Sequence, residues 1–232
     1  MARVPVALVI GNSDGIGLSL TESLLGDGWQ VTGVSRSASR LAGERYAHHV
    51  IDVCHPDYPA LLSSVVSQLP ALTACVYCVG IGEFLELETL ASERRVFETN
   101  LIGAVATAQV VIPHLLRAGS GHFLGLSSQA DALRDGNAPS YAASKAGLSS
   151  YLEGLALACR PRGVSVTNLR FGFVDTKMAQ SEVRPFMISP AQAAQRIRHC
   201  LHTRPVRDTF PKRMALLLWF VRVASSLRRA FS

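Results

Sequence analysis

The sequence has few charged residues and few aromatic ones. Charged residues make up 17% and aromatic residues 7% of the 232 residues, whereas 48% are hydrophobic. Intrinsically disordered chains show the opposite balance, so this composition excludes disorder and predicts a buried core of about one domain. A signal peptide is also lacking, because a strand is expected within the first ten residues, where a cleavable apolar region would lie.

Cysteine is scarce and odd in number. The five cysteines are scattered along the chain: Cys54, Cys75, Cys78, Cys159 and Cys200. This argues against a disulfide framework and favours a reducing cytosol. Cys75 and Cys78 have the spacing of a redox or zinc pair, but they lie in the apolar run 74–80 and no second ligand pair follows. We therefore expect two core cysteines, no metal site and a cytoplasmic protein.

Before residue 196, acidic residues slightly outnumber basic ones. Residues 196–232 hold nine of the 23 Lys and Arg residues and one acid, Asp208, so the net charge of +6 belongs to this end. Such an end solubilises a chain, or it contacts anionic lipid, an acidic carrier protein or nucleic acid. Nucleic acid is the least favoured partner, because few aromatic residues are interleaved with the basic ones.

Apolar runs alternate with helical patterns along the chain. Strands are predicted at 4–10, 31–35, 50–53, 74–79, 122–127 and 164–170, and helices at 15–27, 59–68, 92–117, 140–159 and 190–202. Continuous Val, Ile and Leu runs are typical of strands buried on both faces of a parallel sheet. We expect an α/β fold in residues 1–204, a single-domain doubly wound parallel sheet of about seven strands with helices on both faces.

A C-terminal extension, residues 205–232, is expected to follow the domain. Within it, Met214–Val221 is apolar all around a helix, which must therefore be buried, and Arg222 makes the stretch too short to span a bilayer. Covering a substrate cavity or packing against another subunit is favoured. Peripheral membrane contact through residues 211–232 is the further alternative, weakened because the apolar residues do not gather on one side.

A glycine-rich turn follows the first predicted strand and opens a helix: Gly11-Asn12-Ser13-Asp14-Gly15-Ile16-Gly17. Glycines allow a sharp turn and close approach of the backbone to a pyrophosphate, and the helix N-terminus presents free N–H groups to it. In this context the pattern predicts dinucleotide binding, and an ordinary strand–helix turn is the alternative.

The end of the second strand bears on the choice of cofactor. An acid there would bind the ribose hydroxyls of NAD, whereas an arginine accommodates the 2′-phosphate of NADP. The chain has Ser35 followed by Arg36, with Arg40 nearby, so NADP(H) is preferred and NAD(H) stays possible. Asp14 in the glycine turn adds an opposing negative charge.

Four polar residues suggest acid–base chemistry. Tyr141 and Lys145 lie one turn apart on one helix face, where a nearby ammonium is expected to lower the phenol pKa. Such a pair is common by itself. Ser128, however, ends a strand at the sheet edge that carries chemistry in such folds, and Asn100 is an amide within a long helix that needs a partner.

These residues resemble the short-chain dehydrogenase/reductase family over residues 11–176. The glycine turn, Asp52-Val53, Asn100, Ser128, Tyr141-Ala142-Ala143-Ser144-Lys145 and Gly172-Phe173-Val174-Asp175-Thr176 carry the resemblance. It implies a Rossmann-like fold, hydride transfer between NADP(H) and a ketone or secondary alcohol, and a homodimer or homotetramer. Tyr141 would be the acid/base, Lys145 would lower its pKa and hold the nicotinamide ribose, and Ser128 would bind the substrate oxygen. Asn100 would hold a water that links Lys145 to solvent.

The resemblance also implies a set of cofactor-binding residues. Asp52 and Val53 would bind the adenine, and Val174 and Thr176 the nicotinamide carboxamide. The whole set is Gly11, Ser13, Asp14, Gly15, Ile16, Gly17, Arg36, Asp52, Val53, Gly80, Tyr141, Lys145, Val174 and Thr176.

The chain departs from the family pattern in three places. The family's Asn-Asn-Ala-Gly reads Tyr77-Cys78-Val79-Gly80, its Pro-Gly reads Phe171-Gly172, and the threonine before the first glycine is Ile10. The first change alters side-chain support of the sheet, and the second makes the loop beside the nicotinamide less rigid. None of them removes a proton-transfer group.

The segment 177–189 corresponds to the family's lid. It carries Met178, Phe186, Met187 and Ile188, which suit a hydrophobic or acyl substrate, although a lid packed on its own core would look the same. The sequence thus predicts an NADP-preferring carbonyl reductase. A non-catalytic dinucleotide-binding sensor or scaffold, and a membrane-peripheral protein acting through its tail, are the alternatives.

Overall fold

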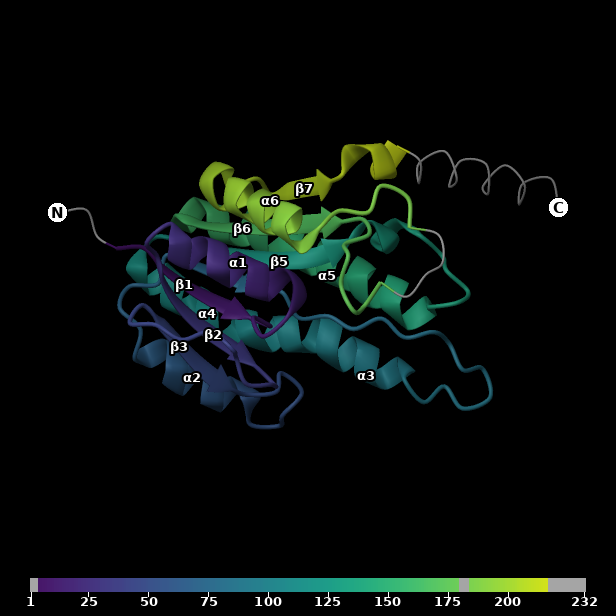
Figure 1. The fold of residues 1–232 in the computed structure, drawn as a ribbon, viewed down its shortest axis with the longest axis horizontal. Helices are drawn as coiled ribbons and strands as arrows, with labels where there is room; N and C mark the ends of the chain where they lie inside the picture. The colour runs from purple at the N-terminus through teal and green to yellow at the C-terminus, as the bar shows by residue number, and fades with distance from the viewer. Residues whose placement is uncertain (1–3, 180–183, 217–232) are drawn as a thin grey trace.

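The computed structural model describes residues 4–179 and 184–216, which form one α/β unit (Figure 1). Its strands are β1 (Val6–Ile10), β2 (Gln30–Ser35), β3 (Tyr46–Val50), β4 (Ala74–Tyr77), β5 (Gly121–Ser128), β6 (Val164–Phe171) and β7 (Arg207–Phe210). They form a seven-stranded sheet in the order β3-β2-β1-β4-β5-β6-β7, and every neighbouring pair is parallel. The predicted doubly wound parallel sheet is confirmed.

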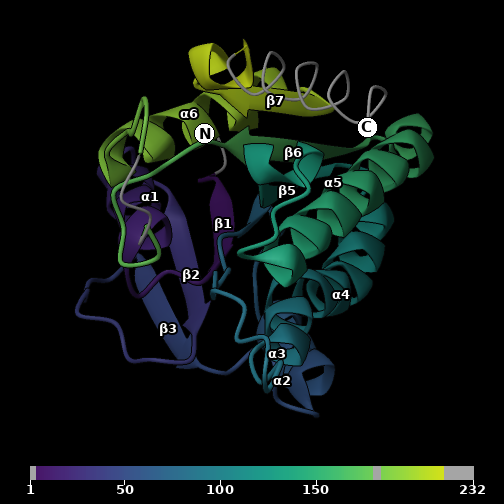
Figure 2. The same ribbon diagram turned by 90° about the vertical axis from the view of Figure 1, so that its right-hand side faces the viewer.

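Helices cover both faces of the sheet (Figure 2). One face carries α1 (Gly15–Gly26) and α6 (Pro190–Thr203). The other face carries α2 (Tyr58–Ser67), α3 (Glu93–Phe97), α4 (Gly103–Ala118) and α5 (Pro139–Cys159). A π-helical turn, Glu98–Ile102, joins α3 to α4, so the predicted helix at 92–117 is continuous but contains one wider turn.

The continuous apolar run of β1 is explained by burial on both sides. Ala7 and Val9 pack into the core beneath α1 and α6, whereas Leu8 and Ile10 pack into the core beneath α4 and α5. Successive side chains of a strand point to opposite faces, so a central strand with two covered faces has no polar position. The central strands can therefore be predicted from their continuous apolar runs in the sequence.

The two edge strands were not located correctly from the sequence. The predicted strand at 50–53 is wrong, because the strand beside β2 is Tyr46–Val50, which is only partly buried. Its first residue is anchored to the glycine turn, since Asn12 Nδ2 donates to the Tyr46 hydroxyl at 2.6 Å. An edge strand pairs with a neighbour on one side only, and its side chains are more exposed to solvent. It therefore needs no continuous run of apolar residues.

At the other edge, β7 pairs with the last four residues of β6. The sheet therefore extends beyond residue 204, where the C-terminal extension was expected to begin. After β7, residues 212–216 are helical. The rest of the expected apolar helix, and most of the stretch proposed for membrane contact, lie outside the described residues.

By length and composition alone, the helix over residues 93–118 is apolar enough to cross a membrane. Val111 and Leu115 of this helix are fully buried against the sheet, as in the core helix of a globular fold, which passes the same test. The helix is therefore weak evidence for a membrane span.

The fold predicts a pH-dependent stability through His122. This β5 side chain is 1% exposed and bonds Thr167 Oγ1 through Nε2 at 2.8 Å, and burial lowers its pKa to about 4. An unfolded histidine titrates near ~6.5. The unfolded state therefore binds more protons, and stability falls as the pH drops from about 6.5 to about 4.

We expect this residue to account for a loss of about 3 kcal/mol in unfolding free energy over that range. Urea denaturation at a series of pH values, for the native protein and His122→Gln, measures it. The variant should show a flatter dependence, and identical slopes in the two proteins would contradict the assignment.

Candidate active site

Two adjoining cavities open at the carboxyl edge of the central strands. A cavity of about 420 Å³ runs along the glycine turn, and one of about 270 Å³ lies over the ends of β5 and β6. Ile16, Cys78, Val79, Gly80, Thr176 and Met178 line both of them. We refer to them as the dinucleotide cavity and the substrate cavity.

The glycine turn is shaped for close backbone approach. Gly11 and Gly15 have φ values of +86° and +54°, which other residues rarely adopt. A Cβ on Gly17 would lie 2.0 Å from the Gly11 carbonyl oxygen, so only glycine lets α1 begin against the turn. Gly11, Ser13, Asp14, Gly15, Ile16 and Gly17, which the sequence proposed as cofactor-binding residues, all line the dinucleotide cavity.

Asp14 caps α1, since its Oδ1 accepts a hydrogen bond from Gly15 N at 2.8 Å. Its Oδ2 lies 2.5 Å from Lys177 Nζ, and the bond to Lys177 together with the Gly15 N–H lowers the pKa of this carboxyl. The negative charge that was expected to oppose NADP is therefore paired with a lysine from the segment after β6. Nothing in the sequence alone links these two residues.

Arg36, Asp52 and Val53 also line the dinucleotide cavity. Arg36 follows Ser35, whose hydroxyl donates to the Ser37 carbonyl at 2.8 Å and shapes the turn. Arg36 has no carboxylate partner among the described residues. Arg40, the other arginine considered, does not line the cavity. It lies 3.7 Å from Glu22 instead.

Further lining residues were not anticipated. On the opposite wall of the dinucleotide cavity lie Arg95, Glu98 and Thr99, from α3 and the π-helical turn, and Cys54 lies beside them. Cys75 is buried in β4, but Cys78 lines both cavities and is only half-buried. Burial raises the pKa of its thiol to about 12, so it is protonated at neutral pH. In the described part of the chain, no group of three His, Cys, Asp or Glu side chains could hold a metal ion.

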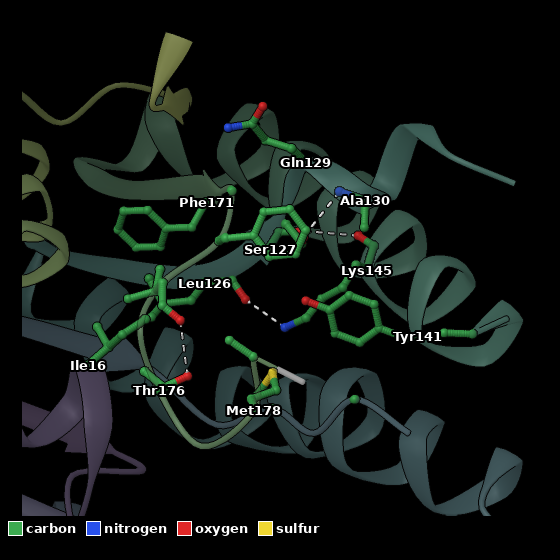
Figure 3. Close-up of a pocket in the computed structure, with 18 of the residues that line it drawn as sticks. Ile16, Leu126, Ser127, Gln129, Ala130, Tyr141, Lys145, Phe171, Thr176 and Met178 are labelled. Carbon is green, nitrogen blue, oxygen red and sulfur yellow. Dashed lines mark hydrogen bonds between the residues drawn. The ribbon is translucent and has the colours of Figure 1, made fainter. Parts of the chain in front are cut away.

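Lys145 lies at the junction of the two cavities. Its side chain is 4% exposed, and its Nζ donates to the Leu126 carbonyl of β5 at 3.0 Å (Figure 3). Burial lowers the pKa of this ammonium to about 8. A Cβ on Gly80 would lie 3.2 Å from Nζ, so the glycine that the sequence shares with the family leaves the space that the lysine fills.

Tyr141 and Ser128 line the substrate cavity together. The Lys145 Nζ lies 5.9 Å from the centre of the Tyr141 ring (Figure 3). The pKa of Tyr141 is nevertheless raised, because burial outweighs its hydrogen bond to Ser128. The expected lowering of the Tyr141 pKa is therefore wrong for this structure. The Lys145 ammonium lies 5.9 Å from the ring centre and donates its hydrogen bond to the Leu126 carbonyl instead.

Asn100 lies in the π-helical turn, fully buried. Its Nδ2 donates to the Ile81 carbonyl at 2.9 Å and to Ser144 Oγ at 3.0 Å, and its Oδ1 accepts from Ile81 N at 2.8 Å. The amide that looked out of place in a helix thus joins the loop after β4 to α5, the helix of Tyr141 and Lys145.

The π-helical turn is also held by Tyr77, the residue that departs from the family's asparagine. Its hydroxyl donates to the Thr99 carbonyl at 2.7 Å. A Cβ on Gly103 would lie 2.5 Å from that hydroxyl, so a glycine makes room for it. Side-chain support at this position is changed, as the sequence indicated, and the structure shows its replacement.

A buried ion pair that the sequence analysis missed lies behind Ser128. Asp131 is paired with Arg170 of β6 and accepts a hydrogen bond from Ser149 Oγ at 2.6 Å. Ser149 in turn bonds Ser127 at 2.8 Å, and Ser127 donates to the Lys145 carbonyl at 3.0 Å. The network fixes α5 against the end of β5. No local pattern could have revealed it, because its members come from four elements.

The rest of the substrate cavity is mostly apolar. Its lining includes Phe84, Leu133, Phe171, Phe173, Val174, Met178 and Met214. Of the expected lid residues, Met178 lines the cavity, Ile188 is buried in the core beneath α6, and Phe186 and Met187 are exposed. Val174 and Ile188 form an isolated β-bridge, which holds the segment after β6 at its two ends. Residues 180–183 of the segment lie outside the described residues.

Comparison with known proteins agrees with this geometry. Residues 5–185 match the family model described as short chain dehydrogenase. An uncharacterized oxidoreductase of Myxococcus xanthus is 28% identical over 224 residues, 90% of this chain and 88% of the relative. Cis-4-hydroxycyclohexanecarboxylate dehydrogenase of Sinomonas cyclohexanicum is 30% identical over 186 residues, 75% of this chain and 74% of the relative.

Solved structures share the fold. A short chain dehydrogenase from Burkholderia cenocepacia in complex with NADP is 22% identical, with a TM-score of 0.84 over 99% of this chain and 96% of that one. With the family model covering most of the sequence, the chain belongs to the short-chain dehydrogenase/reductase family and is an NAD(P)-dependent oxidoreductase.

Proposed function

We propose that this protein is an NADP(H)-preferring carbonyl reductase with Tyr141 as its proton donor. The observation that carries the proposal is that Tyr141, Ser128 and Lys145 line one cavity, which adjoins the glycine turn. Asn100 braces the same helix through Ser144. A protein that only binds a dinucleotide has no need of a phenol, a hydroxyl and an ammonium around one small cavity.

The residues of the dinucleotide cavity fit NADP(H). The turn is packed so tightly that a Cβ on Gly11 or Gly17 would collide with neighbouring atoms, and the first residues of α1 line the cavity, where their free N–H groups would meet a phosphate. Arg36 would bind the 2′-phosphate, Asp52 and Val53 the adenine, and Val174 and Thr176 the carboxamide. Gly80 would leave room for the ribose beside Lys145. When bound, the nicotinamide supplies or accepts the hydride.

The side chains around the substrate cavity can support carbonyl reduction. Burial raises the Tyr141 pKa, so the phenol carries the proton that reduction requires, and lowering of this pKa by a bound cofactor and Lys145 would aid its transfer. Ser128 would donate a hydrogen bond to the same oxygen. Lys145 would stabilise the phenolate that remains, and Asn100 Oδ1, which accepts a hydrogen bond from Ile81 N, would hold a water for proton return. The apolar lining suits a hydrophobic substrate.

The first test is Tyr141→Phe, which keeps the ring and removes the transferable proton. We expect kcat for ketone reduction to fall by about 100-fold or more, with the NADPH dissociation constant unchanged. Steady-state kinetics and NADPH fluorescence titration measure the two quantities. Tyr151→Phe, on the same helix but outside the substrate cavity, is the matched control. Native turnover in Tyr141→Phe would refute Tyr141 as the proton donor, whereas NADPH binding without reduction of any ketone by the native protein would favour a sensor or scaffold.

The second test concerns the cofactor. Arg36→Ala should weaken NADPH binding by about 10- to 100-fold and leave NADH binding nearly unchanged, because a charge-assisted contact to one phosphate is lost. Arg40→Ala is the control, since Arg40 lies outside the cavity lining. Dissociation constants of both cofactors for the three proteins decide it. A native protein that prefers NADH would refute the NADP assignment.

A further inference from the structure

The chain returns to the substrate cavity after the last strand of the sheet. The helical turn at 212–216 follows β7, and it is drawn in yellow at the upper right of Figure 1. Its Met214 is 7% exposed and lines the cavity together with Ser128 and Tyr141. A side chain from the C-terminal end thus forms part of the wall that a substrate would meet.

Gln129 connects this turn to the end of β5, which carries Ser128. It directly follows Ser128, is 2% exposed, and its Nε2 donates to the Pro211 carbonyl at 3.2 Å across 82 residues of sequence. The same carbonyl oxygen accepts a hydrogen bond from Met214 N at 3.2 Å. This one oxygen therefore stabilises the turn and also connects it to Gln129.

Met214 also packs closely against Gly172. A Cβ on Gly172 would lie 3.2 Å from Met214 Cγ, tighter than ordinary van der Waals contact, and 3.4 Å from Gln129 Nε2. The glycine at this position therefore leaves space for both side chains. Met214 is part of a closely packed wall.

The charges at the cavity limit which substrates it suits. Among its described lining residues Lys145 is the one cation, whereas Glu83 and Asp135 are acids. A carboxylate or phosphate in the apolar part would be buried without a partner, which is costly. The cavity is about 270 Å³ and shares lining residues with the dinucleotide cavity, so the space left beside a nicotinamide is small.

We infer that the substrate is a compact, uncharged, apolar ketone whose non-reacting side contacts Met214, and that Met214 sets the upper limit on its size. Gln129 is a positioning residue that holds Met214 in place. The inference rests on the proposed function, because it assumes that the carbonyl oxygen lies at Tyr141 and Ser128. It differs from the substrate named for the Sinomonas cyclohexanicum relative, which carries a carboxylate.

The experiment measures binding separately from turnover. The full chain is saturated with NADP⁺, which cannot reduce a ketone, and is titrated calorimetrically with 4-methyl-, 4-propyl- and 4-pentylcyclohexanone. Met214→Ala frees the volume of about three heavy atoms. Since each buried methylene contributes roughly 0.8 kcal/mol, or about fourfold in affinity, we expect about tenfold tighter binding of the longer ketones and no gain for the methyl compound.

Two further variants sharpen the test. Met187→Ala, an exposed methionine outside the cavity lining, should bind all three ketones like the native protein. Gln129→Met loses the bond to the Pro211 carbonyl, and it should shift the length preference in the same direction as Met214→Ala by a smaller factor. Its thermal unfolding midpoint and its NADPH dissociation constant should stay native, which loss of fold would not allow.

Several results would overturn the inference. The first is an unchanged length preference in folded Met214→Ala. The second is tighter binding of 4-oxocyclohexanecarboxylate than of its methyl ester, and the third is no binding of any ketone to the native protein or to Met214→Ala. Turnover with NADPH is scored separately. Ketones that bind with the expected length preference but are not reduced would refute the proposed function and leave the assignment of Met214 standing.

Discussion

The structure depends on the burial of one ammonium group at the end of β5. Lys145 Nζ is almost fully enclosed, and it donates a hydrogen bond to the Leu126 carbonyl. Removing a cation from water is unfavourable unless its surroundings compensate, and the lowered pKa measures part of that cost. The site tolerates this because Gly80 leaves the room and the strand end offers an oxygen.

The elements around the lysine are braced by polar side chains rather than by apolar packing alone. Asn100 and Tyr77 hold the π-helical turn, and the pair of Asp131 and Arg170 holds the far side of α5 through two serines. The Asn100 amide donates two hydrogen bonds and accepts one in these networks. Polar networks of this kind fix one arrangement of the core. The side chains that line the cavity are therefore held in position by polar residues that lie behind them.

Burial also sets the chemical character of the substrate cavity. It raises the pKa of the Tyr141 phenol, and Lys145 is the one cation among the described residues that line this cavity. In the dinucleotide cavity, the charges of Asp14 and Lys177 offset one another because the two residues form an ion pair.

The sequence by itself determined whatever depends on neighbours along the chain. The glycine turn, the doubly buried strand β1 and the single helical turn between Tyr141 and Lys145 are local, so spacing and residue type were enough to place them. The edge strands β3 and β7 were misplaced or missed because one-sided pairing relaxes the apolar pattern. Only the tertiary structure decided the bond of Gln129 to the Pro211 carbonyl, the place of Met214 in the cavity, and the raised Tyr141 pKa. These depend on burial and on contacts between distant segments, and no spacing along the chain encodes either.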